Sequence, residues 1–143
     1  MKKILFVCTG NTCRSPMAQT LANDIFMREG LELKAYSCGV FAGEGGCAST
    51  HALSIMAEYG LELCSHETSP ISQDLAEEAA AIFTMTKAHK SHVLQVLPHL
   101  ETKVQTLGGD EDVSDPFGGN LDVYRDCAAQ IKSYLEKNDW GKF

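Results

Sequence analysis

One short stretch, residues 8–15, restricts the possible folds of this chain more than any other. Its sequence, CTGNTCRS, is polar, contains a glycine, and lies between the apolar run of residues 4–7 and a helix-like stretch that begins at Pro16. A short apolar run bounded by turn residues predicts a buried strand. Ser15 is of a type that caps helices, and Pro16 then takes the first helical position, where its missing N–H costs nothing. The stretch is therefore predicted to join the end of a strand to the start of a helix.

A loop in this position directs its free backbone N–H groups, and the positive end of the helix dipole, at one point. Such a point binds a tetrahedral anion. Cys8 begins the loop, and we expect its thiol to lose its proton near neutral pH, because reactive thiolates occur at helix N-termini and beside cations. Arg14 supplies a planar fork of donors that fits two phosphoryl oxygens. The pattern predicts attack of the Cys8 sulfur on phosphorus, giving a phosphocysteine that water later hydrolyses.

The composition narrows the class of protein further. A length of 143 residues with 44% hydrophobic content fits one domain, residues 1–143. The net charge of −7 argues against nucleic-acid binding, which needs a basic face. No apolar run reaches the ~18–20 residues of a membrane helix, and Met1-Lys2-Lys3 leads into a strand rather than a signal peptide, so we expect a cytoplasmic protein without membrane contact. Its six cysteines are then mostly reduced, and four of them are expected to be packing or surface residues: Cys38, Cys47, Cys64 and Cys127.

Apolar periodicities along the chain predict an α/β fold. Strands are expected over residues 4–7, 33–37, 80–85 and 103–107. Helices are expected over residues 16–29, 50–59, 72–79, 87–96 and 120–137. The first strand, helix and second strand form a right-handed crossover of a parallel sheet, so the loop at residues 8–15 lies at the carboxyl end of a strand, where open α/β sheets bind ligands. The glycine-rich loop at 38–48 leaves the same edge, and its Phe41 either walls the pocket or covers the core.

Two further groups of side chains have more than one interpretation. His89 and His92 lie one turn apart on the predicted helix 87–96, but no third ligand stands at a recognised spacing, so a polar helix face is preferred to a metal site. Residues 108–119 carry Asp110, Glu111, Asp112 and Asp115. Asp115 differs from the others because Pro116 stiffens its backbone and Phe117 is an apolar neighbour, a setting that keeps a carboxyl proton available for a leaving group.

Residues 6–18, FVCTGNTCRSPMA, resemble the signature of the low-molecular-weight protein-tyrosine phosphatase family, and Asp115-Pro116 resembles the Asp-Pro of its general-acid loop. The likeness covers nearly the whole chain. Thr12 and residues 115–119 are most similar to the bacterial protein-arginine phosphatase branch. The resemblance implies a three-layer, doubly wound fold with a central four-stranded parallel sheet in the order 2-1-3-4 and helices on both faces.

The resemblance also implies the site residues. The catalytic residues are Cys8, Arg14 and Asp115, which it selects among the four acidic side chains. A supporting network keeps Asn11 in a left-handed conformation and contains Ser15, Ser37 and His66, the histidine being a support rather than a base. The substrate-binding residues are Thr9, Gly10, Asn11, Thr12, Cys13, Ser15, Phe41 and Phe117. No metal or organic cofactor is required, because the loop amides and Arg14 replace the cation. Cys13 either forms a reversible disulfide with Cys8 or is a packed thiol.

The favoured hypothesis is a monomeric, cysteine-dependent protein-arginine phosphatase that binds a phosphorylated protein and holds phosphate or another oxyanion in the loop. The first alternative is a protein-tyrosine phosphatase of the same family, whose members usually carry Ile where this chain has Thr12. A thiol-dependent arsenate reductase needs a further redox Cys pair near the third strand, and residues 80–97 contain none. A non-catalytic phosphate-binding module does not explain the presence of both Cys8 and Asp115.

Overall fold

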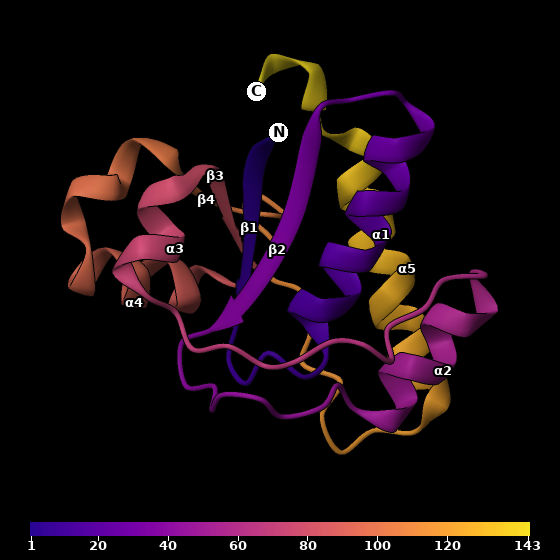
Figure 1. Ribbon diagram of the computed structural model, residues 1–143. Coiled ribbons are helices and arrows are strands. Elements are labelled where there is room, and N and C mark those ends of the chain that lie inside the picture. Colours follow the sequence, from indigo (N-terminus) through magenta and orange to yellow (C-terminus); the bar gives the residue numbers. More distant parts are fainter.

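A four-stranded parallel sheet forms the centre of the molecule in the computed structural model, which describes all residues 1–143 (Figure 1). The strands are β1 (Lys2–Cys8), β2 (Leu33–Gly39), β3 (Ala79–Thr84) and β4 (Val104–Thr106). Their order is β2-β1-β3-β4, and every neighbouring pair is parallel. The predicted α/β fold and strand order are confirmed.

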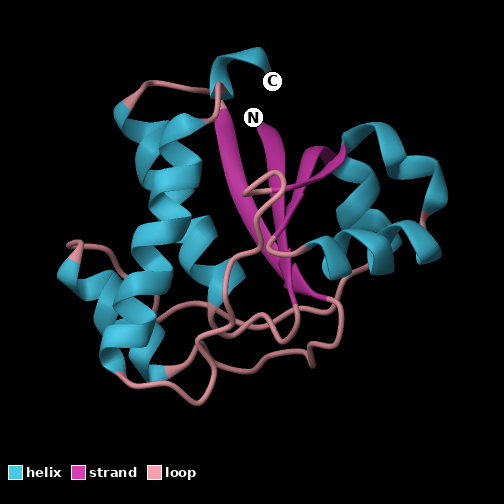
Figure 2. Cartoon of the chain, turned by 180° about the vertical axis from the view of Figure 1, so that it is seen from behind, coloured by secondary structure: helices cyan, strands magenta, loops and turns pink.

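Helices cover both faces of the sheet (Figure 2). Ile4 and Phe6 of β1 pack on one face against α1 (Arg14–Arg28), α2 (Thr50–Glu58) and α5 (Leu121–Lys137). Leu5 and Val7 point to the other face, toward α3 (Gln73–Glu78) and α4 (Lys87–Val96). This alternation is the period of two expected for a strand buried on both sides. The chain also contains two short 3-10 helices, η1 (Pro98–Lys103) between α4 and β4 and η2 (Trp140–Lys142) after α5. No helix has both the length and the apolar character needed to cross a membrane.

The loops that follow β1, β2 and β4 gather at one end of the sheet, at the bottom of both ribbon views (Figures 1 and 2). Parallel strands place all their carboxyl ends at the same edge, so loops far apart in the sequence meet there. Backbone bonds join them: the amide of Phe41 donates to the Thr9 carbonyl at 2.9 Å, and that of Ser49 donates to the Thr12 carbonyl at 2.9 Å. This edge is where the residues expected to be catalytic come together.

The start of α1 differs from the prediction. The helix begins at Arg14 with Cys13 in the capping position, so Ser15 is the second helical residue and Pro16 the third. Ser15 does not cap the helix because its hydroxyl is engaged elsewhere, 2.8 Å from the Cys8 sulfur and 2.8 Å from the Asn11 side-chain nitrogen. Pro16 is still tolerated, since the first four N–H groups of a helix have no partner within it. By contrast, α4 has the predicted bounds, because Thr86 accepts a bond from the amide of His89 and so caps the helix.

All six cysteines are free thiols. Cys38 and Cys127 are buried, whereas Cys47 and Cys64 are exposed, as expected for packing and surface residues. Burial raises the pKa of Cys38 to about 12 and that of Cys127 to about 12. These two thiols therefore stay protonated at neutral pH and are not nucleophiles.

Candidate active site

The loop after β1 turns through Asn11, the only residue other than glycine with a positive φ, at 58°. Its buried side chain accepts a bond from the amide of Ser69 at 2.9 Å and donates to the hydroxyls of Ser15 at 2.8 Å and Ser37 at 2.9 Å. Its carbonyl oxygen accepts a bond from Nε2 of His66 at 2.8 Å. A left-handed conformation is unfavourable for most residues, and these four bonds offset its cost. The side chains expected to support Asn11 do contact it.

Ser69 was not identified from the sequence. It takes part through its backbone N–H, a group that every residue except proline carries and that therefore leaves no signal in the sequence. Gln19 was missed as well, although its side-chain oxygen accepts a bond from the Ser37 hydroxyl at 2.6 Å. Gln19 lies one turn along α1 from Ser15, on the side of the helix that faces β2.

Cys8 is the last residue of β1 and is 2% exposed. Its sulfur lies 2.8 Å from the Ser15 hydroxyl. That hydroxyl accepts a bond from the Asn11 amide, and its single hydrogen has two acceptors within reach, the Cys8 sulfur and the Cys38 carbonyl oxygen at 3.3 Å. The thiol also lies close to the N-terminus of α1, whose dipole favours an anion. Cys8 thus has the surroundings of a nucleophile.

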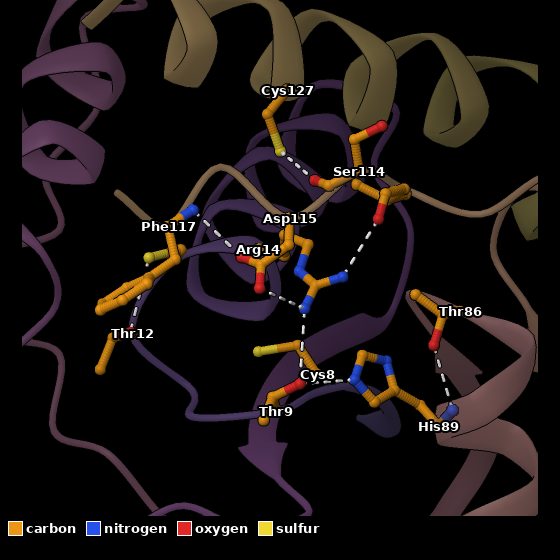
Figure 3. A network of polar contacts seen from close by, with 12 residues as sticks. Cys8, Thr9, Thr12, Arg14, Thr86, His89, Ser114, Asp115, Phe117 and Cys127 are labelled. Carbon is orange, nitrogen blue, oxygen red and sulfur yellow. Dashed lines mark hydrogen bonds and ion pairs between the residues drawn. The ribbon is translucent and has the colours of Figure 1, made fainter. Parts of the chain in front are cut away.

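Arg14 is buried at the start of α1, and its guanidinium is held by contacts on both terminal nitrogens (Figure 3). Nη1 donates to the Val113 carbonyl at 3.0 Å, and Nη2 donates to the Thr9 hydroxyl at 3.4 Å. Nη2 also lies 3.7 Å from a carboxylate oxygen of Asp115, which is largely exposed. The other Asp115 oxygen accepts a bond from the Phe117 amide at 3.1 Å. The side chain of Asp115 therefore faces Arg14 from the loop after β4.

The three residues expected to be catalytic line one cavity of about 270 Å³. The remaining lining residues are Thr9, Gly10, Thr12, Cys13 and Phe117. The loop after β1 contributes the base of this cavity, and the loop after β4 contributes Asp115 and Phe117 at its rim. A larger cavity of about 590 Å³ adjoins Ser37 and His66, but it contains neither cysteine nor arginine. The smaller cavity is the one with a nucleophile, a cation and an acid.

Phe41 does not line this cavity. Its side chain is 74% exposed, and its ring packs edge-on against His92, with 5.1 Å between the ring centroids. The hydrogen bond from its amide to the Thr9 carbonyl fixes the backbone beside the loop, while the ring lies outside the cavity. The expected apolar wall is instead provided by Phe117, which is 79% exposed at the rim.

Two residues near the cavity were not predicted to belong to it. Tyr124 of α5 places its hydroxyl 3.3 Å from the Cys13 sulfur, and burial raises the pKa of this tyrosine. His89 of α4 is 6% exposed, so the expected polar helix face is wrong at this position. Its Nε2 lies 2.8 Å from the Thr9 hydroxyl (Figure 3). The spacing to Val93, one turn further along and also buried, was a usable signal that His89 faces inward.

Comparisons with known proteins match this chain to low-molecular-weight protein phosphatases. The family model described as "Low molecular weight phosphotyrosine protein phosphatase" matches residues 3–138. The protein-arginine-phosphatase of Bacillus subtilis (strain 168) is 40% identical over 139 residues, which cover 94% of this chain and 92% of that protein. The low molecular weight protein-tyrosine-phosphatase PtpB of Staphylococcus epidermidis is 34% identical over 138 residues, covering 94% and 95%. A solved structure of the YwlE arginine phosphatase, a Cys-to-Ser mutant with a phosphorylated active site serine, superposes with a TM-score of 0.90 at 40% identity, covering 93% of this chain and 90% of that one.

Proposed function

The chain belongs to the low-molecular-weight phosphotyrosine protein phosphatase family, and from this premise we propose that it is a cysteine-dependent protein phosphatase whose preferred substrate is phosphoarginine. The observation that carries the phosphatase function is the meeting of Cys8, Arg14 and Asp115 in one cavity. The preference for phosphoarginine is supported by Thr12, which lines the same cavity. The partner is then a phosphorylated protein.

In the first step, the loop amides and Arg14 bind the phosphoryl oxygens, and the Cys8 sulfur attacks phosphorus in line with the leaving group. The S–P bond forms as the P–N bond of phosphoarginine breaks. Protonated Asp115 gives its proton to the departing guanidine nitrogen, which avoids expulsion of an unstable anion. Negative charge that develops on the phosphoryl oxygens is stabilised by Arg14, which is buried and held in place before the reaction.

In the second step, the carboxylate of Asp115 takes a proton from water, whose oxygen attacks phosphorus. The P–S bond breaks, and the thiolate of Cys8 and inorganic phosphate are released. The Ser15 hydroxyl, 2.8 Å from the sulfur, stabilises the departing thiolate. A phosphorylated serine at the active site of the YwlE mutant supports a covalent route for this chain.

Thr12 supports phosphoarginine through its size and its hydroxyl group. Thr12 and Phe117 line both the catalytic cavity and a neighbouring one of about 440 Å³, so the substrate side chain passes between them. Tyrosine-directed members of the family usually carry Ile at this position, which gives apolar contact suited to an aromatic ring. A threonine hydroxyl exchanges hydrogen bonds with a polar, planar guanidine and occupies less space beside the phosphorus. Asp115 also pairs with the positive charge of the guanidinium product.

Phosphotyrosine is the second candidate substrate, because a tyrosine phosphatase is 34% identical to the chain over 138 residues. The deciding experiment compares kcat/KM on matched phosphoarginine and phosphotyrosine peptides for the wild type and Thr12→Ile. We expect the wild type to prefer phosphoarginine. Thr12→Ile should shift the ratio of the two kcat/KM values toward phosphotyrosine by roughly 10- to 100-fold, which corresponds to the free energy that one hydrogen-bonding group typically contributes. Thr102→Ile is the matched control, since Thr102 is exposed in η1. If the ratio of the two kcat/KM values is unchanged in Thr12→Ile, Thr12 is only a packing residue and phosphotyrosine is favoured as the substrate.

A further inference from the structure

His89 is a buried polar side chain with no part in the chemistry described above. It lies in the first turn of α4, where its backbone amide donates to the Thr86 hydroxyl at 3.1 Å. Its imidazole extends from that turn to the loop after β1, and Nε2 lies 2.8 Å from the Thr9 hydroxyl (Figure 3). The other ring nitrogen, Nδ1, is buried and has no hydrogen-bond partner. An incompletely satisfied buried imidazole is unfavourable for stability, so it requires an explanation.

The donors and acceptors around Thr9 connect the imidazole of His89 to Arg14. A guanidinium can only donate, so the Thr9 oxygen accepts the bond from Nη2 of Arg14. The bond between the Thr9 hydroxyl and Nε2 of His89 forms with either neutral tautomer: the hydroxyl donates when the ring proton is on Nδ1, and its second lone pair accepts when the proton is on Nε2. Either arrangement forms one continuous chain of hydrogen bonds, from Arg14 through Thr9 to His89.

The surroundings of His89 keep the ring neutral. Burial, followed by the positive charge of Arg14, lowers the pKa of His89 to about 4. His92 acts in the same direction, while Asp112 and Asp115 on the loop after β4 act against it. The positive end of the α4 dipole also disfavours a protonated ring in its first turn. At neutral pH the imidazole is therefore uncharged.

We propose that His89 is a positioning residue, whose imidazole orients the Thr9 hydroxyl so that it accepts from Arg14 and fixes the plane of the guanidinium for phosphoryl transfer. The Val113 carbonyl holds Nη1 at 3.0 Å, and Thr9 holds Nη2 at 3.4 Å. A planar group held at two nitrogens has one orientation, whereas a group held at one nitrogen can rotate about that contact. The role rests on the proposed phosphatase function, because an oriented guanidinium is needed where phosphoryl charge develops.

The test compares His89→Met with His89→Gln. The two replacements have similar size, but only glutamine has a terminal polar group that can bond to Thr9. With p-nitrophenyl phosphate as substrate, we expect His89→Met to lower kcat about 10-fold and His89→Gln to stay within about 3-fold of the wild type. Thr9→Val should lose as much as His89→Met, and Thr9→Ser, which keeps the hydroxyl, should lose less than Thr9→Val. The double variant Thr9→Val/His89→Met should lose no more than either single variant, because both remove the same chain of bonds.

Equal activities of His89→Met and His89→Gln, or losses that multiply in the double variant, would show that His89 only fills space and would overturn the proposal. Urea unfolding of each variant identifies losses caused by instability. If His89→Met does not fold, the proposal still requires an active His89→Gln and a larger loss of activity in Thr9→Val than in Thr9→Ser. A wild type unable to hydrolyse p-nitrophenyl phosphate would instead refute the proposed phosphatase function, so the two failures are distinguishable.

Discussion

Replacement of Gly39 by alanine tests how closely the end of β2 supports the catalytic loop. Gly39 is opposite Cys8 in the parallel pairing of β2 with β1. A Cβ atom added there would lie 2.9 Å from the Asn11 amide nitrogen and 2.9 Å from the Ala42 Cβ, and closer still to the Thr9 carbonyl oxygen. Real Cβ atoms essentially never approach other heavy atoms within 3.0 Å, and ordinary contact begins at 3.4 Å. The loop must therefore retreat by about 0.5 Å at Asn11 and further at Thr9.

The effect on catalysis follows from this displacement. Because a misplacement of about 1 Å near reacting groups can reduce a rate by ~10²-fold, we expect Gly39→Ala to lower kcat/KM on p-nitrophenyl phosphate by between about 10- and 100-fold. Overpacking of this kind typically costs ~1–3 kcal/mol in the free energy of unfolding, so the folded state should persist at 25 °C. Weaker competitive inhibition by inorganic phosphate would locate the damage in the anion-binding loop.

Gly43→Ala, in the loop that follows β2, is the matched control. No atom lies within 4 Å of a Cβ added at Gly43, and its φ is not positive, so activity and the urea midpoint should be unchanged. Wild-type kcat/KM in Gly39→Ala, with wild-type phosphate affinity, would refute the reasoning, because the loop would then not depend on the absent side chain. An equal loss in both variants would indicate a general sensitivity of residues 38–48 rather than a contact at Gly39.

Three further predictions concern individual side chains. Cys8→Ser should reduce turnover by at least about 10³-fold while phosphate affinity is kept, because a serine hydroxyl stays protonated at neutral pH; substantial residual activity would contradict the covalent route. Asp115→Asn should slow hydrolysis of a poor leaving group by ~10²-fold or more and that of p-nitrophenyl phosphate much less; equal slowing would exclude Asp115 as the acid. His89 has a pKa of about 4 in the folded protein, against the ordinary value of 6.5. Between pH 6.5 and pH 4 the unfolded chain therefore binds more protons than the folded one, so the free energy of unfolding falls as the pH falls through that range. Between about pH 7 and pH 5 the wild type should lose about 2 kcal/mol more than His89→Gln in urea unfolding, and parallel curves would show that the ring is not held neutral.

The fold was predictable because its determinants are local or periodic. The apolar run of β1, the glycine-containing loop and the following helix adjoin one another in the chain, and Thr86 marks the start of α4 three residues before the amide that it caps. The strand order came from a resemblance, since alternating strands and helices alone do not determine which strands are neighbours. Cys8 and Arg14 were identified for the same reason as the fold, because they flank one short loop, whereas Asp115 was selected among four acidic residues by the family resemblance.

The remaining contacts of the site were not predictable, because they join distant segments or use backbone atoms. His89 and Thr9 are 80 positions apart, and Arg14 bonds to the carbonyl of Val113, 99 positions away. Nothing in residue type marks a backbone carbonyl as the partner of an arginine. Ser15 was misassigned for a related reason: its local sequence fits a helix cap, but a tertiary bond to Cys8 uses its hydroxyl instead.

The register of β1 and β2 explains why the glycine beside the loop stands at position 39. Each residue of β1 pairs with the residue 31 positions further along, from Lys2 with Leu33 to Cys8 with Gly39. A slip of one residue would turn the buried side chains of β2 to the opposite face of the sheet, and it would also place Cys38 or Val40 next to the Thr9 carbonyl. Burial of Ala35 on one face and of Cys38 on the other selects the observed register. The packing that stabilises the sheet therefore also places Gly39 beside the anion-binding loop. The loop leaves no room for a Cβ atom at this position, and glycine is the residue type that lacks one.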